Sequence, residues 1–217
     1  MTRQVKRPYR ALRARHFISS LVPITAVLGL SLLFISQANA QNLLVNSGFS
    51  NFWELGGWEV SMGRAEWSER DFFNNNRSGS AKGMHELPGN GGNLMVLRQC
   101  VAAEVGGPYS FGAWTFADSG QGDGTFGGRV FVTIFTESSD CTTGESTFFA
   151  SPTVTTQDEW AVSESTADVP QGVQSILFSL HIFKAAGVEH DAVVFFDRTF
   201  LREPQPDSIY SDRFEQP

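Results

Sequence analysis

The chain has 217 residues, with 16 Lys and Arg against 23 Asp and Glu, and its formal net charge is −7. Six of the bases and none of the acids lie in residues 1–40, so residues 41–217 carry 10 bases and 23 acids, a formal charge of −13. A surface this acidic repels nucleic acid and anionic lipid, which argues against both as partners. It is compatible with neutral sugars, with cations or with solubility alone.

The first 40 residues have the three parts of a bacterial export signal. A basic stretch from Arg3 to Arg15 precedes an almost wholly apolar run, 17–35, which ends at the small residues Ala38-Asn39-Ala40. This order predicts a cleavable signal peptide over residues 1–40 and no membrane span after cleavage. The alternative is a membrane anchor, because a run of this length just spans a bilayer. Pro23 and the Ala-x-Ala site favour cleavage.

Residues 41–203 show period-two alternation of apolar residues between turn-rich segments, with no long helical pattern. This pattern predicts one all-β domain, a two-sheet antiparallel jelly-roll sandwich. The expected strands are 42–46, 58–62, 65–68, 80–84, 94–101, 109–117, 128–137, 146–150, 159–169, 174–184 and 193–201. Residues 204–217, which contain Pro204 and Pro206, are expected to form an exposed tail.

Three of these strands, 109–117, 128–137 and 174–184, alternate a purely apolar face with a mixed one. A solvated face is normally more polar than these mixed faces, so we expect either a ligand groove on one sheet face or a covering loop. Sugars stack on aromatic rings while polar side chains bind their hydroxyls. The predicted ligand-binding residues are Trp114 and Arg129 first, then Phe116, Phe131, Phe135 and His181, with Trp53 and Trp67 as secondary candidates. Trp58 and Trp160 are expected in the core.

The two cysteines of the mature chain are Cys100 and Cys141. In an oxidising compartment such a pair most simply forms one disulfide. Two buried free thiols are the alternative.

Several short motifs occur in the order found in one family. The chain reads NLLVNSGF at 42–49, GGW at 56–58, QCV at 99–101, YSFGAW at 109–114 and FDRTFL at 196–201. This set, which spans nearly all of 42–202, resembles family 4/9-type carbohydrate-binding modules. The resemblance implies a galactose-binding-like jelly roll and a secreted, non-catalytic module whose partner is a polysaccharide or a cell-surface glycan.

The same resemblance implies a metal. Many members of that family hold a structural calcium between the first and last strands, and Asp197 matches the first Asp of their terminal pair. On the alternation of 193–201, Asp197 is also expected to point inward, where a carboxylate needs a partner. Ser50 and Arg198 depart from the family pattern, and Arg198 is an alternative partner that could itself neutralise Asp197.

The tail at 207–215, DSIYSDRFE, resembles a short C-terminal motif of secreted gammaproteobacterial proteins. The resemblance implies a Gram-negative source, with the protein secreted, periplasmic or at the cell surface. Sorting or surface display is the expected role of the motif, and an unimportant polar tail is the alternative.

No catalytic signature is present. The chain has neither a Gly-x-Ser-x-Gly elbow nor a His-Glu-x-x-His motif, and the adjacent pairs His85-Glu86 and His190-Asp191 point opposite ways in a strand. We therefore expect a binding module and not an enzyme. A monomer is a separate expectation, which no motif of the sequence tests. One competing class is a structural or adhesive cell-surface scaffold without sugar binding. Another, a lyase or hydrolase, is disfavoured by the small number of bases.

Overall fold

The computed structural model describes residues 41–50, 54–75, 78–87, 89, 91–103, 105–121 and 125–203. The expected signal peptide, the candidate Trp53 and the tail 204–217 lie outside the described residues. Within the described part, the structure has ten strands, one 3-10 turn (η1, Ser119–Gln121) and no helix long and apolar enough to span a membrane. The all-β prediction is confirmed.

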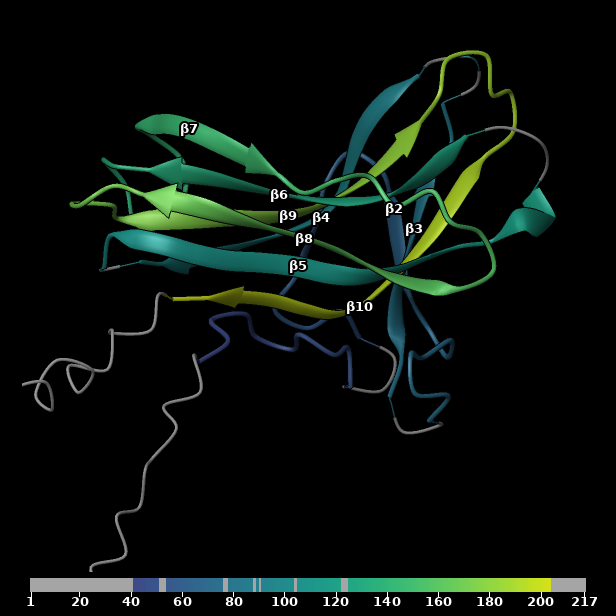
Figure 1. The fold of residues 1–217 in the computed structure, drawn as a ribbon, viewed down its shortest axis with the longest axis horizontal. Coiled ribbons are helices and arrows are strands. Elements are labelled where there is room, and N and C mark those ends of the chain that lie inside the picture. The colour runs from purple at the N-terminus through teal and green to yellow at the C-terminus, as the bar shows by residue number, and fades with distance from the viewer. Residues whose placement is uncertain are drawn as a thin grey trace, which may run out of the picture. The chain divides into compact units, whose positions relative to one another are not determined.

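The strands form two five-stranded antiparallel sheets that pack face to face (Figure 1). The first, called here the β6 sheet, has the spatial order β1 (Glu59–Val60), β4 (Gly92–Ala102), β9 (Ser175–Lys184), β6 (Phe126–Phe135) and β7 (Glu145–Ala150). The second, the β5 sheet, has the order β2 (Arg64–Ser68), β3 (Ser80–His85), β10 (Ala192–Arg202), β5 (Gly107–Ala117) and β8 (Trp160–Val169). In Figure 1, β6 and β9 lie in the upper layer and β5 and β10 in the lower one.

The core lies between the sheets and is built from the purely apolar faces that alternation predicts. Its fully buried members include Tyr109, Phe111 and Ala113 of β5, Val130, Val132 and Ile134 of β6, and Ile176, Phe178, Leu180 and Ile182 of β9. Trp58, expected in the core, joins this cluster, and its ring packs edge-on against Phe178 at 5.8 Å between centroids. Burial of these side chains is the main stabilising term of the fold.

The expected strand 42–46 is wrong, because the chain turns there. Asn46 and Phe49 have φ angles of 49° and 45°, in the left-handed region, so no strand continues past them. The segment is still fixed to the last strand: the Asn42 side chain donates to the Thr199 carbonyl at 2.9 Å and accepts from the Leu201 amide at 3.0 Å. The N-terminal turn therefore lies against β10.

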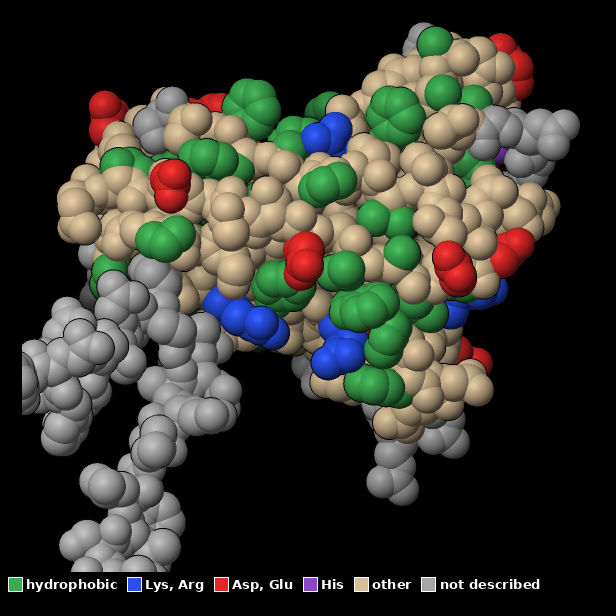
Figure 2. Space-filling view, viewed as in Figure 1, with side chains coloured by type: hydrophobic (Ala, Val, Ile, Leu, Met, Phe, Trp, Pro, Cys, Tyr) green, Lys and Arg blue, Asp and Glu red, His purple; other side chains and the backbone are tan. Residues whose placement is uncertain are grey.

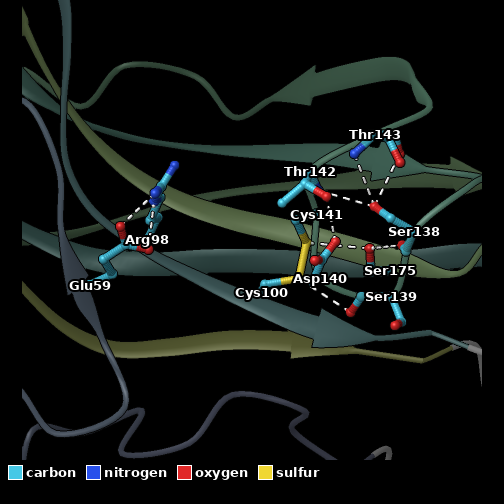
Figure 3. Close-up of a disulfide and its surroundings, with 10 residues drawn as sticks. All are labelled: Glu59, Arg98, Cys100, Ser138, Ser139, Asp140, Cys141, Thr142, Thr143 and Ser175. Carbon is cyan, nitrogen blue, oxygen red and sulfur yellow. Dashed lines mark hydrogen bonds and ion pairs between the residues drawn. A yellow bond between two sulfur atoms is a disulfide. The ribbon is translucent and has the colours of Figure 1, made fainter.

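The predicted disulfide between Cys100 and Cys141 is confirmed, with the two Cα atoms 6.0 Å apart (Figure 3). It joins the end of β4 to the segment between β6 and β7, and Ser138 folds that segment by accepting from the amides of Thr142 and Thr143. The Ser175 hydroxyl at the start of β9 donates to the Ser138 carbonyl at 2.6 Å. The disulfide segment is thus fixed over one end of the β6 sheet.

Candidate functional site

The six predicted ligand-binding residues do not share one sheet face. Trp114 and Phe116 belong to β5, whereas Arg129, Phe131 and Phe135 belong to β6, and His181 belongs to β9. All six alternate away from the core, but the two groups point outward from opposite sheets. The expectation of a single platform is therefore corrected to two separate surfaces.

On the β5 sheet, the segment 69–75 lies across the outer face. The Phe72 ring contacts Trp114 at 4.3 Å and Trp160 at 6.1 Å between centroids. The Arg70 guanidinium lies 4.2 Å from the centre of the Phe116 ring and 4.7 Å from that of Phe195. Figure 2 shows apolar and basic side chains gathered over the region of β5 and β10.

The effect of this cover is that the β5 face is largely closed. Phe116 is only 8% exposed, and Trp114 keeps a partly exposed edge. Trp160, expected in the core, instead belongs to this outer cluster, where it lies 5.6 Å from Phe116. These rings contact one another and the Arg70 guanidinium, so their favourable contacts are already made within the chain, without a ligand.

Among the described residues, the ring and cation–π contacts at the centre of the outer face of the β6 sheet come from its own strands and not from a covering segment. Strand pairing aligns Met95, His181 and Arg129 in one row across β4, β9 and β6. The next row pairs Ser179 with Phe131, and the Phe148 ring of β7 lies 6.0 Å from the Phe131 ring. Directly paired residues lie on the same side of a sheet, so these side chains form one surface, called here the β6/β9 face.

Apolar rings and polar groups alternate on the β6/β9 face. The Phe131 ring lies 4.3 Å from the His181 ring and has the Arg129 guanidinium 4.6 Å from its centre. Phe148 is 61% exposed, and sequence reasoning missed it as a site residue. The adjacent rings of Phe148 and Phe149 inside an expected strand could have indicated it. Side chains alternate along a strand, so one of two adjacent rings points outward.

Two nitrogen atoms on this face are buried without a hydrogen-bond partner among the described residues, Arg129 Nε and His181 Nδ1. The other imidazole nitrogen, His181 Nε2, lies 3.0 Å from the Ser179 hydroxyl. Burial, with a smaller contribution from the charge of Arg129, lowers the pKa of His181 to about 4, so the ring is neutral at pH 7. The face therefore contains two buried polar atoms that the described residues leave without a partner.

The remaining candidates lie away from this surface. Phe135 is 6% exposed, because it pairs with Ser175 at the end of the sheet that the disulfide segment covers. It is not accessible to a ligand in this arrangement. Trp67, a secondary candidate, is half-buried, and its indole Nε1 donates to the Phe49 carbonyl at 2.9 Å.

Asp197 lines a pocket of about 660 Å³ on the outer side of the β5 sheet, together with Asp71, Trp114 and Arg198. The expectation that Asp197 points into the core is wrong, because Val194 and Phe196 are the residues of β10 that do so. Asp197 is nevertheless 1% exposed. Its Oδ2 accepts from the Phe72 amide at 3.0 Å and its Oδ1 from the Arg198 amide at 2.6 Å.

The carboxyls of Asp71 and Asp197 form a buried acidic pair. Burial is the main cause that raises the pKa of Asp197 to about 6, and the charge of Asp71 raises it further against the two amide hydrogen bonds. The alternative partner Arg198 is not used, because its guanidinium lies over the rings of Phe72 and Phe73 at 5.2 and 4.7 Å. Among the described residues, no ion pair joins it to Asp197.

The pair fits the chemistry of a hard cation. Asp71 Oδ1 is buried and has no hydrogen-bond partner in the described part of the chain. The described residues contain no cluster of three or more His, Cys, Asp or Glu side chains, so other calcium ligands would be carbonyl or hydroxyl oxygens. Ser47, Gly48 and Ser50 line the same pocket and carry such oxygens.

No protein-family profile matches the sequence, and no curated protein matches it either. Solved structures do match. One is the CBM22-1 xylan-binding domain from Paenibacillus barcinonensis Xyn10C, which is 13% identical, covers 75% of this chain and 94% of its own, and has a TM-score of 0.50. Another is the enzymatically active domain of Bacteriophage CBA120 tailspike protein 4, which is 12% identical, covers 74% of this chain and 21% of its own, and has a TM-score of 0.51.

A third similar structure is TmCBM61 in complex with beta-1,4-galactotriose, which is 20% identical, covers 76% of this chain and all of its own, and has a TM-score of 0.47. A carbohydrate-binding module is thus among the solved structures that share the fold of this chain. At these identities the likeness concerns the fold, which a binding module and a domain from an enzyme share.

Proposed function

We propose that this chain is an exported, non-catalytic carbohydrate-binding module and that its ligand lies across the β6/β9 face. The observation that carries the proposal is the union, on the β6/β9 face, of an exposed and a half-buried phenylalanine ring with the partly exposed polar side chains of Arg129 and His181. Rings accept the C–H faces of a sugar, and nitrogen donors or acceptors fix its hydroxyls. The fold shared with a xylan-binding domain supports the proposal.

The arrangement of the carboxyl groups is the reason for proposing a non-catalytic role. A glycosidase holds two carboxyls about 5–10 Å apart on either side of a sugar. Asp71 and Asp197, two of the carboxyls that line the same pocket, interact directly and are buried. Calcium chemistry explains such a pair better than hydrolysis does.

Removing the exposed ring of the β6/β9 face should weaken binding. We expect Phe148→Ala to lower the affinity for a bound polysaccharide roughly tenfold, because the sugar loses its stacking surface. Affinity electrophoresis and calorimetry of the purified protein against neutral and acidic polysaccharides measure the effect. The matched control is Phe73→Ala, since Phe73 is 65% exposed, close to the 61% of Phe148, but lies on the β5 sheet side.

The same experiment separates the alternatives. Loss of binding in Phe73→Ala or Trp114→Ala, with Phe148→Ala unaffected, would move the site to the pocket beside Trp114. If the wild-type protein binds no polysaccharide, the structural or adhesive scaffold is favoured. Such a scaffold needs no open ligand face, and segment 69–75 already covers the β5 face.

We also propose that Asp71 and Asp197 hold a structural calcium ion against the N-terminal turn. Without the ion, the raised pKa means that ionised Asp197 destabilises the fold above about pH 6. Calcium should therefore raise the melting temperature at pH 7, and the increase should shrink below pH 6 as the carboxyl is protonated.

Differential scanning fluorimetry with and without calcium measures this increase, and Asp197→Asn is the variant expected to show none. An equal increase in that variant would place the ion elsewhere.

A further inference from the structure

Arg129 differs from the other arginines that the structure describes. Arg98 is paired with Glu59, Arg64 with Glu86 and Arg70 with Asp118, while Arg198 and Arg202 are exposed to water. Arg129 is partly shielded, its Nε is buried, and no described carboxylate lies within ion-pair distance of it. Among the described arginines without an acidic partner, Arg129 is the one that is partly shielded from water, since Arg198 and Arg202 are exposed.

Leaving this guanidinium unpaired is unfavourable. An arginine stays charged in proteins, and a charge that loses water without gaining a partner raises the free energy of the folded state. Burial is also the cause that lowers the pKa of Arg129 from its ordinary value. The ring of Phe131 beneath the guanidinium compensates in part, but it leaves the Nε hydrogen without an acceptor.

The groups around Arg129 supply no second charge. Its row neighbours are Met95 and His181, and the imidazole is neutral at pH 7. Phe131 lies next to it on the same strand. The β6/β9 face thus combines one fixed positive charge with rings and neutral polar atoms.

We infer that the ligand is a polysaccharide with a neutral backbone and scattered carboxylate substituents, and that Arg129 binds one such carboxylate; this rests on the proposed function of the β6/β9 face. A carboxylate can accept from the two terminal nitrogens of the guanidinium, in a bidentate geometry that arginine favours. A dense polyuronate suits the site less well, because the formal charge of −13 on residues 41–217 repels a polyanion while one arginine neutralises one carboxylate.

The test compares acidic polysaccharides with their own carboxyl-reduced forms, in which each uronic acid has become the neutral sugar. Glucuronoxylan and xanthan, which have neutral backbones with acidic side groups, are titrated in both forms into the wild-type protein by calorimetry. We expect at least one native polymer to bind about tenfold more tightly than its reduced form, the size of a charge-assisted hydrogen-bonded pair. Arg129→Gln should bind both forms equally weakly, and Arg129→Lys should restore part of the difference.

Arg202→Gln is the matched control, since Arg202 lies 4.7 Å over the Phe200 ring on the other sheet, as Arg129 lies over Phe131. It should discriminate the two forms as the wild type does. Equal affinity of the wild type for native and reduced polymers, or unchanged discrimination in Arg129→Gln, would overturn this inference and leave the proposed function intact. If the wild-type protein binds no polysaccharide, neutral ones included, the proposed function and this inference are both overturned.

Discussion

Replacing both Cys100 and Cys141 with serine should lower the free energy of unfolding by about 4 kcal/mol. The cysteines are 41 residues apart, and opening this loop returns conformational entropy to the unfolded chain. The segment between β6 and β7 would keep the bonds of Ser138 to Thr142 and Thr143 but lose its covalent link to β4. Chemical denaturation followed by tryptophan fluorescence measures the loss.

Two comparisons make that result specific. Wild-type protein treated with a thiol reductant should unfold at the same denaturant concentration as the double variant, because both lack the same link. The double variant should also expose Phe135 more readily, since the disulfide segment covers that end of the β6 sheet. A double variant as stable as the oxidised wild type would show that the segment is held by its hydrogen bonds alone.

The second large effect is the dependence of stability on the protonation of His181. The folded-state pKa of this histidine is about 4 and its ordinary value is 6.5, so the unfolded chain takes up the proton first as the pH falls. The folded protein should therefore lose about 3 kcal/mol of stability between pH 6.5 and pH 4 from this group. The physical cause is the burial of the imidazole beside the charge of Arg129.

His181→Gln removes this titration, so stability is measured for both proteins from pH 7.5 to pH 4. The difference between them should be constant above pH 6.5 and should shift in favour of the variant as the pH falls. The comparison is needed because Asp197, with a folded pKa of about 6 against 3.8, acts in the opposite direction over nearly the same range. A difference that stays constant down to pH 4 would mean that His181 is protonated freely in the folded state.

The sequence was sufficient to predict the fold and the inward residues of β5, β6 and β9, because both depend on local alternation, whereas Asp197 and Trp160 were wrongly expected to point inward. Val130, Val132 and Ile134 could be assigned to the core from their spacing alone, and all three are fully buried. Two of the expected aromatic positions, Trp114 and Phe131, were also correctly turned away from the core. What alternation cannot give is the identity of the sheet to which each strand belongs.

The division of the predicted site illustrates this limit. β5 and β6 follow one another in the chain and have similar patterns, and consecutive strands often pair. Here the connection crosses from one sheet to the other, which separates Trp114 from Phe131. The cover formed by Arg70 and Phe72 was equally hidden, because segment 69–75 has no periodicity and its place depends on contacts with distant strands.

The closure of the β5 face by segment 69–75 makes the molecule one-sided. A long polymer bound across the β6/β9 face would run along one flank, so the orientation of the domain relative to such a polymer would be set by its own architecture. The largely closed flank is then free to contact another partner. If the protein is held at a surface through that flank, the bare flank faces outward, and many copies held in this way would present their rings in the same direction.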